Sequence, residues 1–160
     1  MTTSPQLPKR RSIRLPGFDY ASQGAYFITI VTKDRRCAFG TIVDDALQAT
    51  ALGVIATEEW AANGSPVAAP FVLMPNHLHA IVVLSAGVNM RLGAIIGRFK
   101  LGVLRRARTA GVAPTDGALW QRNYYEHVIR DERDWNAIEA YIDDNPRRWM
   151  EDAENPGSLT

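Results

Sequence analysis

The sequence predicts one α+β domain, in which an antiparallel sheet is covered by helices. The chain of 160 residues has the length of a single domain and contains no internal repeat. Short runs rich in β-branched and aromatic residues alternate with longer stretches whose apolar residues recur at the period of a helix. Two of the short runs flank the tight turn Pro75-Asn76, so the strands that they predict pair antiparallel.

The first part of the chain predicts an arm, a strand and a helix. Residues 1–23 are basic and contain three separated prolines, so we expect an extended arm. Residues 25–32 predict a central strand, which ends in the polar turn at residues 33–36. Residues 44–62 predict a helix that packs on the sheet. Acids at its start complement the helix dipole, and one face is apolar, formed by Leu47, Ala51, Val54 and Ile55.

A hairpin and a second helix follow. Residues 67–74 and residues 77–84 predict the two strands of the hairpin. Residues 89–108 predict a helix with Asn89 as its cap. The apolar stripe of this helix, which we expect to be buried, consists of Leu92, Ile95, Ile96, Phe99 and Val103.

The C-terminal part completes the order β-α-β-β-α-β-α. Residues 119–129 predict a strand, and a last helix begins near residue 132 and is ended or kinked at Pro146. The first six elements match the split β-α-β arrangement of ferredoxin-like folds, an antiparallel sheet with helices on one face. We therefore expect a single domain over residues 24–150, followed by a flexible, solvated acidic tail at residues 151–160.

Composition excludes some classes of protein and favours others. The single Cys37 cannot form an internal disulfide, so we expect a small packed residue in a reducing compartment, and a cytoplasmic protein. No segment approaches the length of a membrane span, and no membrane partner is expected. Residues 1–108 contain 13 Lys and Arg against 6 Asp and Glu, whereas residues 109–160 contain 5 against 11. A basic part of this kind suits a polyanion, although a solvated charge run is an alternative.

Arginines on the second predicted helix form a more specific basic feature. Arg91, Arg98 and Arg105 recur every seven residues, so they drift by only about 20° per step and form a ridge. The same segment contains Lys100, Arg106 and Arg108 and no acid. The ridge is therefore a candidate for binding phosphates.

Two short patterns carry possible chemistry. His77 and His79 lie two residues apart in a predicted strand, so both imidazoles point to one face and form half of a metal site or a hydrogen-bonded pair. Tyr141 and Asn145 lie four residues apart on one edge of the last predicted helix. Taken alone, such a tyrosine is usually an amphipathic packing residue.

Considered together, these patterns resemble a known family. The chain combines His77-Leu78-His79 with Tyr141-Ile142-Asp143-Asp144-Asn145-Pro146 and with Arg11-Ser12-Ile13-Arg14-Leu15. It also contains Met74-Pro75-Asn76, Trp120-Gln121-Arg122 and Tyr125-Glu126-His127. Over residues 11–149 the chain resembles the REP-associated, IS200-like tyrosine transposases. This is the single-tyrosine branch of the HUH endonucleases, which are named for two histidines flanking an apolar residue.

The resemblance implies a metal-dependent enzyme that cuts and rejoins single-stranded DNA. His77, His79 and Asn145 match the metal-binding residues, and Tyr141 matches the nucleophile that forms a 5′-phosphotyrosine. Open positions beside these ligands suit Mg²⁺ or Mn²⁺. The implied substrate is single-stranded or hairpin-forming repeat DNA, acted on by a monomer or a homodimer.

Further residues are candidates for contacting that DNA or supporting the site. His127 either hydrogen-bonds within the sheet or helps to position a phosphate or the tyrosine. The expected DNA contacts come from the arm, the ridge and the segment before the last strand, namely Arg10, Arg11, Arg14, Arg91, Arg98, Lys100, Arg105, Arg106, Arg122 and Tyr124.

Two alternatives remain at this stage. A domesticated protein can retain the fold and bind hairpin DNA without cutting it. A phosphodiesterase of the two-histidine-motif type is less consistent with the sequence, because it needs a second His-x-Ser or His-x-Thr motif, and His127-Val128-Ile129 does not supply one.

Overall fold

A computed structural model describes residues 24–85 and 89–157 of the chain. Four strands form one antiparallel sheet in the order β4-β5-β1-β6, with β1 at Gly24–Val31, β4 at Phe71–Met74, β5 at His77–Leu84 and β6 at Tyr125–Ile129. The central strand β1 pairs with β5 on one side and β6 on the other. This is the strand order of the predicted split β-α-β arrangement.

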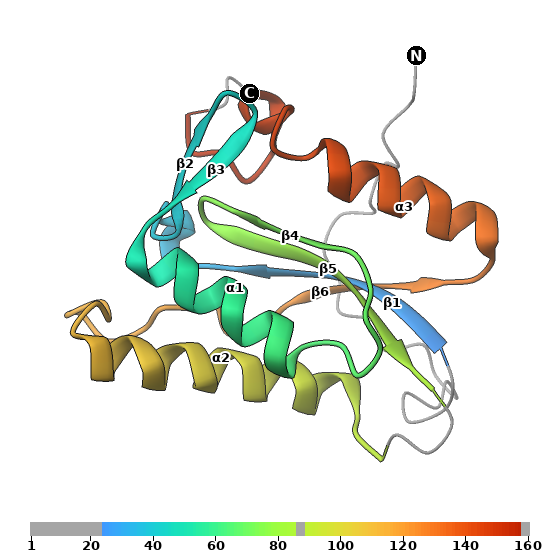
Figure 1. The fold of residues 1–160 in the computed structure, drawn as a ribbon, viewed down its shortest axis with the longest axis horizontal. Coiled ribbons are helices and arrows are strands. Elements are labelled where there is room, and N and C mark those ends of the chain that lie inside the picture. Colours follow the sequence, from blue (N-terminus) through green and yellow to red (C-terminus); the bar gives the residue numbers. More distant parts are fainter. Residues whose placement is uncertain (1–23, 86–88, 158–160) are drawn as a thin grey trace.

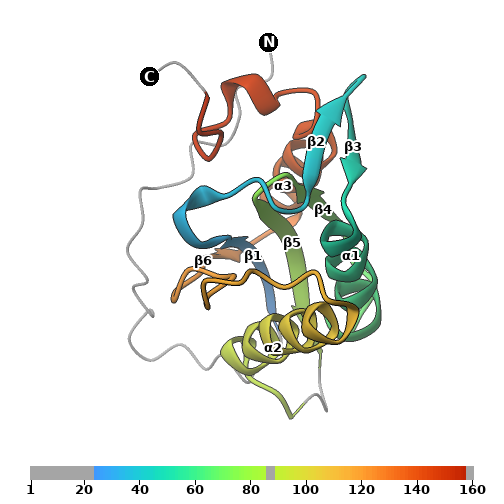
Figure 2. The ribbon, with the colours of Figure 1, turned by 90° about the vertical axis from the view of Figure 1, so that its left-hand side faces the viewer.

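Helices cover both faces of the sheet (Figures 1 and 2). Helices α1 (Ala51–Asn63) and α2 (Leu92–Ala110) lie against one face, and α3 (Glu132–Asp144) lies against the other. Successive residues of β1 point to opposite faces, so Tyr26, Ile28 and Ile30 pack beneath α1 and α2 while Phe27 packs beneath α3. The predicted α+β class, with a separate C-terminal helix, is confirmed.

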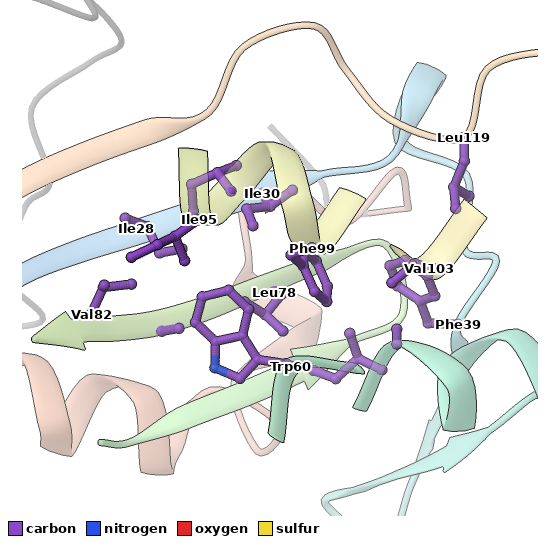
Figure 3. Packing of buried hydrophobic residues seen from close by; sticks show 14 of the residues in the cluster. Ile28, Ile30, Phe39, Trp60, Leu78, Val82, Ile95, Phe99, Val103 and Leu119 are labelled. Atoms are coloured by element: carbon purple, nitrogen blue, oxygen red, sulfur yellow. The ribbon is translucent and has the colours of Figure 1, made fainter. Parts of the chain in front are cut away.

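The larger core lies between the sheet and the helix pair (Figure 3). Phe99 of α2 has no exposed surface and its ring lies 5.1 Å from that of Trp60 on α1 and 5.5 Å from that of Trp120. All five apolar residues predicted for the buried stripe of α2 are buried. This core packs one face of the sheet against α1 and α2, and α3 covers the other face.

The segment predicted as the start of the first helix forms a hairpin instead. Strands β2 (Gly40–Val43) and β3 (Ala46–Ala49) pair through a turn at Asp44 and Asp45, whose φ angles are 50° and 60°. Helix α1 begins only at Ala51, capped by the Thr50 hydroxyl, which accepts from Gly53 N at 3.1 Å. The prediction was wrong because two consecutive acids also suit a two-residue hairpin turn. Of the residues predicted for the apolar face of this helix, Leu47 lies in β3 and Val54 is 46% exposed.

Several smaller boundaries also differ from prediction. Strand β4 begins at Phe71, and β6 begins at Tyr125, although Trp120 forms an isolated bridge with Thr32. The cap of α2 is Arg91, two residues after the predicted Asn89. The expectation of a packed Cys37 was wrong, because this thiol is exposed just after the 3-10 turn η1 (Lys33–Arg35).

Residues 151–157, which we expected to be solvated, fold back against the domain. After the 3-10 turn η2 (Trp149–Glu151), Asn155 is only 9% exposed and its Nδ2 donates to Trp149 O at 2.9 Å. The Glu154 carbonyl accepts from Asn76 Nδ2 at 2.6 Å. The return of this segment to the start of β5 brings new side chains to the histidine pair. Within the described ranges, no helix is both long and apolar enough to cross a membrane.

Candidate active site

The two histidines lie at the start of β5, on the sheet face that α3 covers. His77 is completely buried and His79 is 3% exposed. Their Nε2 atoms are 3.0 Å apart, and the ring of His79 stacks on Phe27 at a centroid distance of 5.3 Å. The period of the strand therefore points both imidazoles at the same buried position.

Neighbouring polar groups fix how His77 is protonated. Asn76 Nδ2 donates to the carbonyls of Arg35, at 3.1 Å, and Glu154, so Asn76 Oδ1 faces His77 and accepts from its Nδ1 at 2.8 Å. The Nε2 atom of neutral His77 consequently carries a lone pair. His79 Nδ1 lies 2.8 Å from the Thr29 hydroxyl. When that hydroxyl accepts, both Nε2 lone pairs face each other, which is the arrangement that a shared cation stabilises.

Burial keeps both rings neutral. It lowers the pKa of His77 to about 3, although hydrogen bonding to Asn145 opposes the shift. It also lowers the pKa of His79, with the neighbouring His77 adding to the effect. Because metals bind the neutral imidazole, the pair is ready to bind a cation at pH 7 without first losing protons.

Helix α3 brings Tyr141 and Asn145 to the same place. The Tyr141 ring lies 5.3 Å from that of His79 and 6.0 Å from that of Phe27. Burial raises the pKa of the Tyr141 phenol, and a hydrogen bond from Asn145 lowers it. Asn145 is 4% exposed, and its Oδ1 is buried without a hydrogen bond of standard geometry in the described part of the chain. A buried amide oxygen beside two imidazoles is a suitable further ligand for a cation.

Asp152 adds a carboxylate that the sequence did not predict. Its Oδ2 lies 3.6 Å from His77 Nε2, its side chain is 9% exposed, and one ligand atom each of His77, His79 and Asp152 falls within 4.8 Å of the others. Burial raises the pKa of this carboxyl group. One signal in the sequence that the segment after Pro146 packs against the domain was Trp149, a large apolar residue. Its ring lies 6.1 Å from that of His77.

His127 lies on the same sheet face but has a different partner. Its Nε2 lies 3.0 and 3.3 Å from the two oxygens of Asp134 on α3. Its cross-strand partner on β1 is Phe27. Among the residues that the structure describes, His127 is outside the group that could hold a metal ion.

The predicted basic residues are divided in space. Arg91, Arg98 and Arg105 are exposed along α2. Helix α2 lies on the opposite side of the sheet from α3, which carries Tyr141 (Figure 1). Arg98 donates to Asn63 Oδ1 at 2.7 Å. The three predicted contacts of the arm, Arg10, Arg11 and Arg14, lie outside the described residues.

The other predicted contacts are partly engaged within the fold. Although its own segment contains no acid, Arg106 forms ion pairs with Glu58 and Glu59 of α1. Lys100 is half-buried and donates to Gln121 O at 2.8 Å. Arg122 is exposed, whereas Tyr124 packs partly buried against the larger core.

Comparison with known proteins identifies the family of the chain. The family model described as "Transposase IS200 like" matches residues 20–145. The chain belongs to this family. An uncharacterised protein of Haemophilus influenzae is 37% identical to this family member, and the alignment covers 89% of the chain and 91% of the relative. The resemblance predicted from the sequence is thereby confirmed at the level of the family.

One solved structure shows the fold of this IS200-like protein, and a second aligns with it more weakly. A REP-associated tyrosine transposase bound to a REP hairpin aligns with a TM-score of 0.58 at 21% identity, over 89% of this chain and 74% of that one. A putative transposase from Deinococcus radiodurans aligns over 86% of this chain and 97% of its own, with a TM-score of 0.49 and 21% identity. The first of these confirms the fold.

Proposed function

We propose that the protein is a metal-dependent endonuclease and strand transferase for single-stranded DNA, with Tyr141 as the nucleophile. The observation that carries this proposal is the contact of the Tyr141 ring with His79, in a buried site that also contains His77, Asn145 and Asp152. A phenol beside neutral imidazoles and amide and carboxylate oxygens is what a metal-assisted attack on a phosphodiester requires.

The residues would divide the chemistry as follows. His77, His79, Asn145 and Asp152 would hold Mg²⁺ or Mn²⁺, and the ion would polarise a phosphate oxygen and offset the charge that develops on it. Tyr141 Oη would attack phosphorus and lose its proton, forming a phosphotyrosine bond while the bond from phosphorus to the 3′ oxygen breaks. That oxygen would take up a proton and leave as a 3′-hydroxyl. Attack by a 3′-hydroxyl on the phosphotyrosine would reverse the step and rejoin the strands.

Hairpin-forming repeat DNA is the substrate that we propose. Membership of a transposase family and the fold shared with a REP-associated transposase bound to a REP hairpin support this choice. The exposed Arg91, Arg98 and Arg105 would contact the phosphates of the stem on the far side of the sheet from the cutting site. We propose that the protein acts on this DNA in the cytoplasm.

The polarity of the covalent bond provides the test. Hairpin oligonucleotides with a single-stranded flank are labelled at either the 5′ or the 3′ end, incubated with protein and Mn²⁺, and separated under denaturing conditions. We expect only the 3′-labelled fragment to migrate with the protein, and EDTA to remove that band. A retained 5′-labelled fragment would contradict the proposed polarity. Hairpin binding that is insensitive to EDTA, with no adduct, would favour a non-cleaving DNA-binding protein.

Asp152 is expected to contribute to metal affinity. The substitution Asp152→Asn keeps the shape of the side chain but removes a charged ligand, so Mn²⁺ should bind about 10 to 100 times more weakly. The matched control is Glu151→Gln, because the Glu151 side chain is 71% exposed on the neighbouring position. Isothermal titration with Mn²⁺ measures both variants. An unchanged affinity in Asp152→Asn would mean that Asp152 covers the site without binding the ion.

A further inference from the structure

We propose that Arg148 is a catalytic residue that binds the scissile phosphate beside Tyr141. This inference rests on the proposed function, because it assigns a second group to the same reaction. The sequence pattern gave no reason to select Arg148, since Pro146 was expected to end or kink the helix. The backbone of the described chain supplies the reason.

Helical geometry continues beyond the assigned end of α3. Asn145 has φ −60° and ψ −44°, and Arg148 N is shared between Asp144 O at 3.2 Å and Asn145 O at 3.1 Å. The chain therefore makes one more turn of mixed α and 3-10 type, which ends at Arg148, where φ is −99° and ψ is 16°. Tyr141, Asn145 and Arg148 therefore stand at positions i, i+4 and i+7 and share one face. The neighbouring Arg147 is rotated by about 100° from Arg148.

Acidic neighbours hold the Arg148 guanidinium in place. Glu151 Oε2 accepts from its Nε at 3.3 Å and from its Nη2 at 3.1 Å, and Asp144 Oδ2 lies 4.0 Å from Nε. The side chain of Arg148 is 41% exposed. The positive charge also acts on the phenol, because Arg148 is among the groups that lower the pKa of Tyr141 against the effect of burial.

A phosphate is the ligand that this position favours. The guanidinium presents planar donors that match two phosphate oxygens, and negative charge on those oxygens grows as Tyr141 attacks. The ion pair with Glu151 is open to water, since the Glu151 side chain is 71% exposed, so it is weak enough for a phosphate to replace or share it. Arg148 would thus act on the same phosphate as the metal, from the side of the tyrosine.

The decisive comparison is between Arg148→Gln and Arg147→Gln. Arg147 is 68% exposed and paired with Asp144, so it controls for loss of one positive charge from the same turn. Adduct formation is measured in single turnover at saturating hairpin DNA and Mn²⁺, together with the Mn²⁺ dissociation constant and the melting temperature. We expect Arg148→Gln to slow adduct formation by about 100-fold or more without changing the other two quantities, and Arg147→Gln to slow it by less than about threefold.

Two further measurements separate a catalytic role from a structural one. Added guanidinium ion should partly restore the rate of Arg148→Gln. Arg148→Lys, which keeps the positive charge but lacks the planar pair of donors, should be intermediate. Equal rates for the Arg148→Gln and Arg147→Gln variants would overturn the inference, as would a rate loss that follows a loss of Mn²⁺ affinity or of melting temperature. If the unmodified protein forms no adduct, the proposed function itself fails; if it does and Arg148→Gln matches it, only the role of Arg148 fails.

Discussion

Replacing Tyr141 by Phe is expected to eliminate the covalent DNA adduct completely. The substitution removes only the oxygen that would bond to phosphorus, so no adduct at this position can form. The ring that packs against Phe27 and His79 remains, and the fold and the metal ligands should be unaffected. Adduct yield with 3′-labelled hairpin DNA, Mn²⁺ affinity and melting temperature are the three quantities to measure.

Tyr125 offers the matched control for this experiment. Its ring packs on the same Phe27 at a centroid distance of 6.2 Å, and its hydroxyl is also buried, without a hydrogen-bond partner among residues 24–85 and 89–157. Tyr125→Phe should retain the adduct. If Tyr141→Phe still formed the adduct at the original yield, Tyr141 would not be the nucleophile.

Replacing His77 by Ala is expected to abolish both Mn²⁺ binding and adduct formation. His77 Nε2 lies 3.0 Å from His79 Nε2 and 3.6 Å from Asp152 Oδ2, so its loss removes the ligand atom that stands between the other two. We expect the affinity for Mn²⁺ to fall by more than about 100-fold, since even groups outside the ligand set contribute 10- to 100-fold. Titration calorimetry measures the affinity, and His79→Asn, which introduces a smaller polar side chain, repeats the test at the second ligand.

His127→Ala is the control for the histidine substitutions. This side chain is about 30% exposed and bonded to Asp134, so its removal should leave Mn²⁺ affinity unchanged. Melting curves add a second readout, because an ion at 100 times its dissociation constant stabilises the folded state by about 2.7 kcal/mol. A rise in melting temperature with Mn²⁺ that survives in His77→Ala would indicate that the cation binds elsewhere.

Local periodicity predicted the elements whose residues are related along the chain. The helical period selected the five buried residues of α2, from Leu92 to Val103, and the structure buries all of them. The helical period failed for residues 44–50, where Asp44 and Asp45 fit both the start of a helix and a hairpin turn. In the structure both residues have positive φ angles and form the turn. Periodicity cannot distinguish these two uses of an acid pair.

The sequence by itself determined which candidate site residues share a face. The strand period placed His77 with His79, and the helical period placed Tyr141 with Asn145. Only the tertiary structure decided that these two pairs meet, that Asp152 returns to them, and that Arg106 is neutralised by Glu58 and Glu59 of another helix. The physical reason is that a repeat along the chain fixes only directions within one element. Contacts between distant residues depend on which sheet face α3 covers. They also depend on the half-buried Trp149, whose ring lies 6.1 Å from that of His77 at the point where the C-terminal segment returns to β5.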